Sequence, residues 1–337
     1  MIKRVPIISD EYNVKPAGAL VVLTDNLSGT AFELSPSEFM KATTNGRMLV
    51  IESEGKKTTE TKFWFEVMEG CELPKELTDD DLYVLAACLA EQAKGNKVTT
   101  EGIIWRNQGG KGNPEPKKIE EIRQSVNKMM SLKIHIDATE TYEKLKQLKK
   151  DDRWSAEVVG TILPCVYTTT KLNGVPNTLT IKFLDFSPMF LYALTKGQIT
   201  VIPAKVLNVP KTKNTQFFLE LKIYINIRID QIKRARERPK SKNFPKTIRL
   251  DTLYSKCLIP PKENDRMQKK RIRDDIALYM EFLVEQGVII EFKFVDDQNN
   301  EHKNLKDCTK ITFNYDDTQK RLKIGDIGWN FISQPTK

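Results

Sequence analysis

The chain has 337 residues, in which 54 lysines and arginines outnumber 45 aspartates and glutamates and give a formal net charge of +9 at pH 7. This length is enough for two or three domains, each with its own hydrophobic core. No apolar run is long enough to span a bilayer, and residues 1–16 lack the apolar core of a signal peptide. We therefore expect a folded cytoplasmic protein that binds no membrane.

The 5 cysteines are widely scattered and never form a C-x-x-C pair, so they predict neither a disulfide framework nor a zinc knuckle. Only 2 histidines are present, which excludes His-rich metal sites. We expect buried thiols in a reducing compartment, no bound metal and no cofactor.

The first 75 residues are rich in predicted strands. Residues 19–25 and 63–69 have the composition of strands, and residues 35–45 have the pattern of a short capped helix. These patterns do not indicate a function for this segment.

Residues 76–209 predict three helices followed by a hairpin. Thr78, Thr100 and Pro116 stand at the expected starts of the helices, and Asn173-Gly174 is a strong signal for a hairpin turn. The third helix carries an apolar stripe formed by Ile119, Ile122, Val126, Met129 and Met130. This order is typical of a winged-helix domain, a variant of the helix-turn-helix.

The same order recurs in residues 210–320. Three expected helices are followed by two strands around a polar tip. The helices cover residues 214–239, 247–257 and 266–287. The strands cover residues 288–296 and 308–316. The apolar stripe of the third helix is Ile272, Ile276, Tyr279 and Leu283. The sequence therefore predicts an α+β protein of two tandem winged-helix domains. An additional N-terminal α/β segment covers residues 1–75, and a tail covers residues 321–337.

The glycine-rich stretch from Asn107 to Lys118 raises the question of a nucleotide phosphate loop. Such a loop needs a hydroxyl residue after its lysine, but Lys111 is followed by Gly112. The preceding residues 99–105 also lack the pattern of a buried strand. A turn between helices is the more typical interpretation, and it would place Lys111 near a backbone phosphate.

Basic residues gather in two clusters of the second unit, between Arg228 and Arg249 and between Lys262 and Arg273. Cations at the start of a helix oppose its dipole, which favours acids there. This placement suits a helix end that meets DNA phosphates. Two such clusters beside one predicted recognition helix favour DNA over the alternative, a solvated basic face.

The segment from Lys233 to Arg249 is expected to be extended, because Pro239 and Pro245 interrupt any helix there. We expect it to follow phosphates without reading bases. In the less basic first unit, Gln124 and Asn127 could read adenine edges, although an ordinary exposed role is slightly favoured. The predicted DNA-binding residues are Lys111, Lys117, Lys118, Gln124, Asn127, Lys128, Arg234, Arg236, Arg238, Lys240, Lys242, Arg266, Lys269, Lys270, Arg271 and Arg273.

Catalytic patterns are weak in this sequence. Asp79, Asp80 and Asp81 could bind magnesium, but adjacent carboxylates at a helix start are more often caps. The candidate nucleophiles Tyr167, Tyr192, Tyr224 and Tyr254 have neither a histidine pair nor a carboxylate set nearby in the sequence. We therefore expect no enzymatic activity and no catalytic residues.

Residues 185–229 resemble the junction between the two winged helices of the iteron-binding plasmid replication initiators, the Rep proteins. Leu194, Lys196 and Gly197 loosely match the turn of that junction, whereas Asn214-Thr215-Gln216 replaces the usual serine and arginine before the long helix. The order of parts from Leu77 to Tyr315 also agrees.

The resemblance implies a protein that binds repeated double-stranded origin sites with both units and opens the origin. It also implies recruitment of the host replicative helicase or its loader, and a switch between a repressing homodimer and an initiating monomer. Two alternatives stay open: a winged-helix transcription regulator of a phage or mobile element, and an origin nickase or primase.

Overall fold

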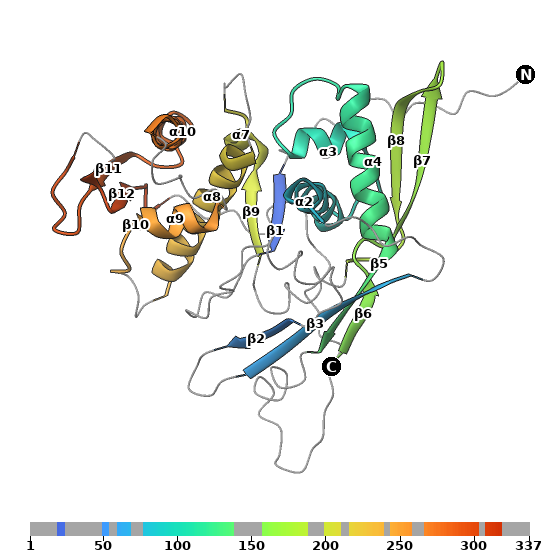
Figure 1. Cartoon of the computed structure of the whole chain (residues 1–337), viewed down its shortest axis with the longest axis horizontal. Helices are drawn as coiled ribbons and strands as arrows, with labels where there is room; N and C mark the ends of the chain where they lie inside the picture. The colour runs from blue at the N-terminus through green and yellow to red at the C-terminus, as the bar shows by residue number, and fades with distance from the viewer. Residues whose placement is uncertain are drawn as a thin grey trace, which may run out of the picture.

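The chain folds into an α+β protein (Figure 1). The computed structural model describes residues 19–23, 49–53, 59–68, 77–137, 157–187, 199–209, 216–238, 243–257, 266–302 and 307–318. Within them, two groups of helices each carry a small antiparallel sheet, and two further sheets include strands from the first 75 residues. None of the helices in these ranges is both long and apolar enough to cross a bilayer.

The first winged helix is built in the expected order. Its elements are α2 (Asp79–Ala93), β4 (Val98–Thr100), α3 (Glu101–Asn107), α4 (Pro116–Ser131), β7 (Cys165–Leu172) and β8 (Val175–Phe183). The sheet has the order β4-β8-β7, so its first strand pairs with its last. Asn173 and Gly174 both have positive φ, at 51° and 80°, which confirms the hairpin turn predicted between β7 and β8.

The second winged helix repeats this topology. Its elements are α8 (Gln216–Arg236), β10 (Thr247–Arg249), α9 (Leu250–Lys256), α10 (Arg266–Glu285), β11 (Glu291–Val295) and β12 (Lys310–Asn314). Its sheet order, β10-β12-β11, again pairs the first strand with the last. The expected helix start at residue 247 is wrong, because residues 247–249 form β10. The two tandem winged helices themselves are confirmed by matching element order and matching strand pairing.

Local signals explain where the helices begin and which face they bury. Thr78 and Asp81 form a reciprocal capping box at the start of α2, in which the Asp81 carboxylate accepts from the Thr78 backbone N–H at 2.7 Å. Pro116 occupies the first turn of α4. The apolar stripe of α4 is buried at Ile119, Ile122, Val126 and Met129, and the whole predicted stripe of α10 is buried. The capping interpretation of Asp81 is therefore confirmed.

Strands from the first 75 residues pair with strands that come later in the chain. β1 (Ala19–Leu23) pairs antiparallel with β9 (Ile199–Pro203). β2 (Leu49–Ser53) and β3 (Thr59–Val67) join β5 (Leu132–Asp137) and β6 (Glu157–Thr161) in a four-stranded sheet of order β2-β3-β5-β6. The expected helix at residues 35–45 lies outside the described residues.

The short helix α7 (Ala204–Leu207) links the two winged helices. Its backbone carbonyls accept hydrogen bonds from two buried side chains of the second unit: Lys222 Nζ donates to Leu207 O at 2.8 Å, and Tyr279 Oη donates to Val206 O at 3.1 Å. From the first unit, Gly109 packs so tightly that a Cβ there would stand 2.9 Å from Cβ of Leu207. The two units therefore share a packed junction at α7.

Candidate nucleic-acid interface

The first half of α4 presents exposed polar side chains opposite its buried stripe. Lys117 and Gln124 are exposed, Asn127 is half-buried, and Lys111 is exposed in the loop before the helix. The tip of the β7–β8 hairpin lies at the same end of the unit as the start of α4 (Figure 1). In a winged helix the third helix and the hairpin approach the duplex together, so the DNA contact of α4 stays a prediction that this arrangement permits.

Polar contacts within the protein involve two of the predicted residues of α4, Lys118 and Gln124. Lys118 Nζ lies 3.1 Å from Glu121 Oε2, and Gln124 Nε2 donates to Glu120 Oε1 at 3.2 Å. Arg123 also pairs with Glu120. The hydrogen bond from Arg123 is the main cause that lowers the pKa of Glu120, and the charge of Lys171 on the hairpin adds to it.

Lys128 lies at the contact between α4 and α2. Its ammonium lies 2.9 Å from the Asp81 carboxylate, which is almost fully buried. The same carboxylate caps α2, so Lys128 compensates a charge that burial would otherwise make costly. The structure thus gives Lys128 a role in the fold, and its contact with DNA stays a prediction.

The glycine-rich loop packs against Trp105 and connects the helices α3 and α4, so it is not the loop of a strand–loop–helix cradle. Trp105 Nε1 donates to the Lys111 carbonyl at 3.2 Å, and the Lys118 ammonium lies 5.9 Å from the centre of the indole ring. Gly109 and Gly112 have positive φ, at 86° and 66°, as a tight turn requires. The turn predicted between α3 and α4 is confirmed.

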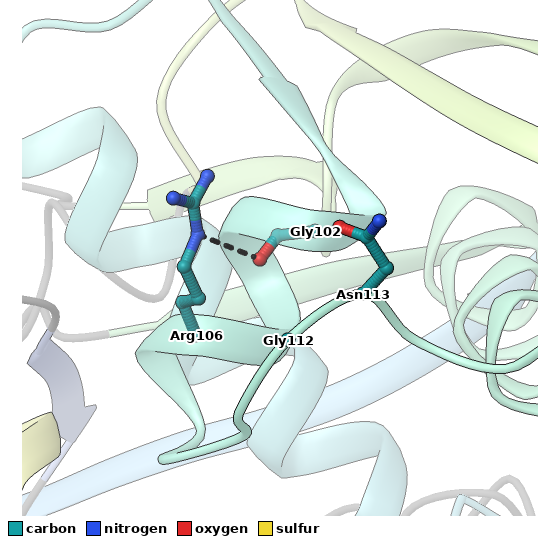
Figure 2. Close-up of a pocket in the computed structure, with 4 residues that line it drawn as sticks. All are labelled: Gly102, Arg106, Gly112 and Asn113. Carbon is teal, nitrogen blue, oxygen red and sulfur yellow. Dashed lines mark hydrogen bonds between the residues drawn. The ribbon is translucent and has the colours of Figure 1, made fainter. Parts of the chain in front are cut away.

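A shallow hollow beside this loop is lined by Gly102, Arg106, Gly112 and Asn113 (Figure 2). Arg106 Nε donates to the Gly102 carbonyl at 3.2 Å, while the terminal nitrogens of the guanidinium point away from that carbonyl. Arg106 is exposed in the last turn of α3. The sequence pattern does not indicate this cation, because it is an isolated charge in a short helix.

The start of α10 carries the second group of predicted residues. Lys270 and Arg271 are exposed, and Arg273 is half-buried. The side chains of Arg266 and Lys269 are not among those that the structure describes. Since the stripe of α10 is buried, the exposed cations occupy the outward side of the helix, as a recognition helix requires.

The basic segment after Arg228 differs from the expected extended chain. α8 continues to Arg236, so Lys233, Arg234 and Arg236 lie on its last turn, and the expectation of an extended conformation is wrong for these residues. Cations at this end complement the helix dipole, which favours the helical arrangement. Arg238 is exposed just beyond the helix, whereas Lys240 and Lys242 lie outside the described residues.

Arg234 has partners inside the fold. Its guanidinium lies 2.7 Å from the Asp230 carboxylate and donates to the Ile199 carbonyl of β9 at 2.6 Å. Asp230 also accepts a hydrogen bond from the Thr200 hydroxyl at 2.9 Å. This network ties α8 to β9, so Arg234 stabilises the junction, and its contact with phosphate stays a prediction.

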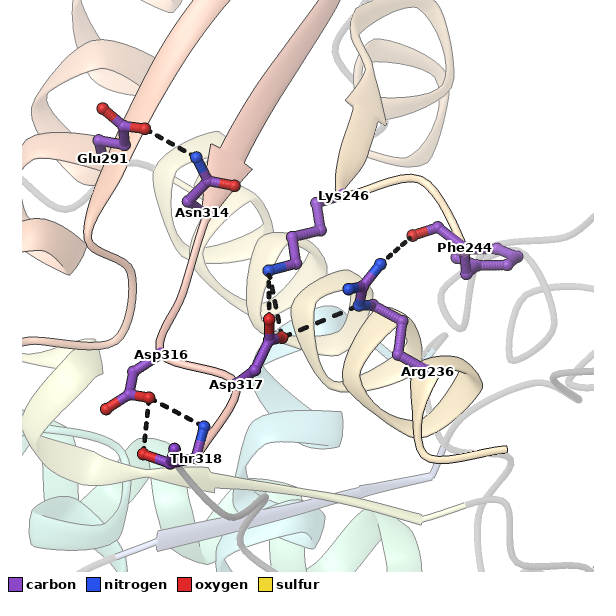
Figure 3. Close-up of polar contacts among 8 residues, drawn as sticks. All are labelled: Arg236, Phe244, Lys246, Glu291, Asn314, Asp316, Asp317 and Thr318. Atoms are coloured by element: carbon purple, nitrogen blue, oxygen red, sulfur yellow. Dashed lines mark hydrogen bonds and ion pairs between the residues drawn. The ribbon is translucent and has the colours of Figure 1, made fainter. Parts of the chain in front are cut away.

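Lys233 and Arg236 at the end of α8 form, together with Lys246, Tyr315 and Asp317, what we call the Asp317 cluster. Figure 3 shows Arg236, Lys246 and Asp317. Lys246 Nζ lies 3.1 Å from Asp317 Oδ1, and Arg236 Nε lies 3.9 Å from the same oxygen. The ammonium groups of Lys233 and Lys246 lie 4.8 and 4.2 Å from the centre of the Tyr315 ring. Burial lowers the pKa of Lys233 and raises that of Tyr315.

Asp317 is absent from the predicted site because it lies 71 positions from its cationic partner Lys246 in the sequence. The carboxylate of its neighbour Asp316 has other hydrogen-bond partners. It accepts from the Thr318 backbone N–H at 2.8 Å and from the Thr318 hydroxyl at 2.6 Å (Figure 3). Asp317 therefore pairs with Arg236 and Lys246, while the charges of both Asp316 and Asp317 act on Lys233.

Two solved structures are similar to this chain. No protein-family model and no curated protein matches it. It is similar to a solved structure of domains 2 and 3 of RctB, with 13% identity and a TM-score of 0.41, over 81% of this chain and 91% of that one. A second structure of RctB domains 2–3 shows 14% identity and a TM-score of 0.38, over 70% and 77%.

Proposed function

We propose that this chain is a sequence-specific double-stranded DNA-binding protein that initiates replication of a plasmid or mobile element by binding repeated origin sites. One observation carries this proposal: two winged helices of identical strand order follow each other, and each exposes cations on the first half of its third helix. These cations are Lys117 in α4 and Lys270 and Arg271 in α10.

The physical basis is the combination of phosphate neutralisation and base reading. Exposed lysines and arginines displace the counterions that surround DNA, which supplies affinity for any sequence. A helix that enters the major groove with its first turns can then distinguish base pairs by their edges. On α4, Gln124 and Asn127 are the polar side chains suited to adenine.

The initiator role draws on the resemblance of residues 185–229 to the junction of the iteron-binding Rep proteins. On this proposal the chain acts without catalytic activity, recruits the host replicative helicase or its loader, and can form a homodimer. A transcription regulator of a phage or mobile element would use the same two units. That alternative differs in the arrangement of its target sites.

Footprinting on the DNA that surrounds the gene tests the proposal. We expect several protected sites in tandem, spaced by about two helical turns, because a repeated origin presents the same duplex face to successive copies. A single protected operator at a promoter would support the regulator instead. Strand cleavage that depends on magnesium would overturn the non-catalytic assignment.

A further inference from the structure

The cations of the Asp317 cluster are held in place by groups other than Asp317. Arg236 Nη1 donates to the Phe244 carbonyl at 3.0 Å (Figure 3), and the ammonium of Lys246 lies over the Tyr315 ring. The C-terminal end of α8 also favours positive charge at Lys233 and Arg236. The arrangement of cations therefore does not require the carboxylate.

The Asp317 carboxylate is more exposed to solvent than the cations that it faces. The Asp317 side chain is 62% exposed, whereas those of Arg236 and Lys246 are 25% and 16% exposed. Asp317 thus covers the cations from the solvent side. An ion pair with so exposed a member contributes little to stability, because water competes for the carboxylate.

We propose that Lys233, Arg236 and Lys246 form a binding site for a phosphodiester of the DNA backbone, which Asp317 occupies in the free protein. This inference rests on the proposed function. A phosphodiester carries the same single negative charge and presents oxygens to the same donors, so it can take the place of the carboxylate. Asp317 then weakens binding to any duplex until phosphate displaces it.

Several features favour a phosphodiester as the ligand. The cations are immobilised by a carbonyl, an aromatic ring and a helix end, so little side-chain entropy is lost when an anion binds. Arg238, which is exposed directly beyond the cluster, extends the positive surface along the chain. A linear polyanion can bridge such neighbouring charges, which a single small anion cannot.

The test replaces the carboxylate by an amide of the same shape. Asp317→Asn is compared with Glu301→Gln, which also removes one exposed carboxylate from an ion pair: Glu301 is 59% exposed and lies 2.8 Å from Lys293. Both variants change the net charge equally. Binding is measured on a random-sequence duplex at several salt concentrations, with circular dichroism as the control for folding.

We expect Asp317→Asn to bind the random duplex about threefold to tenfold more tightly than the wild type, and Glu301→Gln to change affinity less. Lys246→Gln in the wild-type background should weaken binding, and in the Asp317→Asn background it should remove the gain. Equal gains in the two carboxylate variants would overturn the proposal, because they would reflect net charge alone. Unchanged binding by Lys246→Gln would also overturn it.

The outcomes separate this inference from the proposed function. If the wild type binds duplex DNA but Asp317→Asn behaves like the wild type or binds more weakly, only the phosphodiester site is wrong. If the wild type binds no duplex at any salt concentration, the proposed function fails and the phosphodiester site fails with it. If Asp317→Asn does not fold, Asp317 is a structural residue and the proposal is overturned.

Discussion

The indole ring of Trp105 occupies the space into which a side chain at position 110 would extend. A Cβ on Gly110 would stand 2.0 Å from Cε2 of that ring, far inside van der Waals contact. The ring is held there because its N–H donates to the Lys111 carbonyl. The glycine at position 110 is therefore needed to keep the turn between α3 and α4 closed over Trp105.

Gly110→Ala should destabilise the protein by about 1–3 kcal/mol, because the loop or the ring must move to admit the methyl group. Gly102→Ala is the matched control, since its Cβ would meet no atom closer than 3.9 Å and lies in helix α3. We expect the control to be neutral or to stabilise by up to about 1 kcal/mol. Urea unfolding of both variants measures the difference; equal stabilities would show that the ring moves freely.

Tyr279→Phe should destabilise the junction of the two units by about 1–3 kcal/mol. The hydroxyl is fully buried, donates to the Val206 carbonyl and accepts from the Asn226 amide. Its removal leaves both partners buried with one hydrogen bond fewer. Tyr254→Phe, at a half-buried tyrosine of α9, serves as the control and should change the free energy of unfolding by less than about 0.5 kcal/mol.

Lys270→Ala combined with Arg271→Ala should weaken binding to the cognate site by at least about tenfold, if α10 enters the major groove. Stability should change by less than about 0.5 kcal/mol, because both side chains are exposed. The control removes the exposed lysines Lys97 and Lys205, which changes the net charge equally. Similar losses in the two double variants would show that α10 contributes charge alone.

Arg234→Gln and Arg238→Gln should distinguish a residue that stabilises the fold from a residue that contacts phosphate. Arg238→Gln should reduce the slope of log affinity against log salt by about 0.9, equally on cognate and random duplexes, if it contacts one phosphate. Arg234→Gln should instead lower the free energy of unfolding, because Asp230 loses its buried partner. A sequence-dependent loss in Arg238→Gln would show that this residue reads bases.

Asp296 should contribute to stability above pH 4 and lose this contribution in acid. A hydrogen bond with His302, at 2.9 Å, is the largest cause that lowers the pKa of Asp296 from 3.8 to about 2. Because the folded-state pKa is the lower one, protonation favours the unfolded state as the pH falls from about 4 to about 2. Thermal melts should show a smaller decline over this range in Asp296→Asn than in the wild type. Identical declines in Asp296→Asn and the wild type would show that Asp296 does not contribute to stability in this way.

Local patterns were sufficient to predict the long helices, the hairpin turn and the repeated order of elements, but not the short helix α7. The stripe of α10 and the Asn173-Gly174 turn depend on residues that are close in sequence, and both are confirmed. The strands β4 and β10 were missed because three residues are too few to show a strand period. They become strands only because β8 and β12 provide hydrogen-bonding partners.

The candidate site was less predictable, because charge runs do not reveal their partners. Lys128 pairs with Asp81 across 47 positions, and Arg234 donates to Ile199 across 35. Such contacts depend on the packing of α4 on α2 and of α8 on β9. The sequence indicates how many cations are present, and the fold determines which of them face solvent.

The hydrogen bonds at α7 determine how this protein can be divided. A fragment that begins after residue 209 would keep Lys222 and Tyr279 but would lose the Leu207 and Val206 carbonyls to which they donate. A fragment that ends before residue 204 would lack the leucine that packs against Gly109. Neither winged helix can therefore be grafted onto another protein as a module without carrying α7 with it.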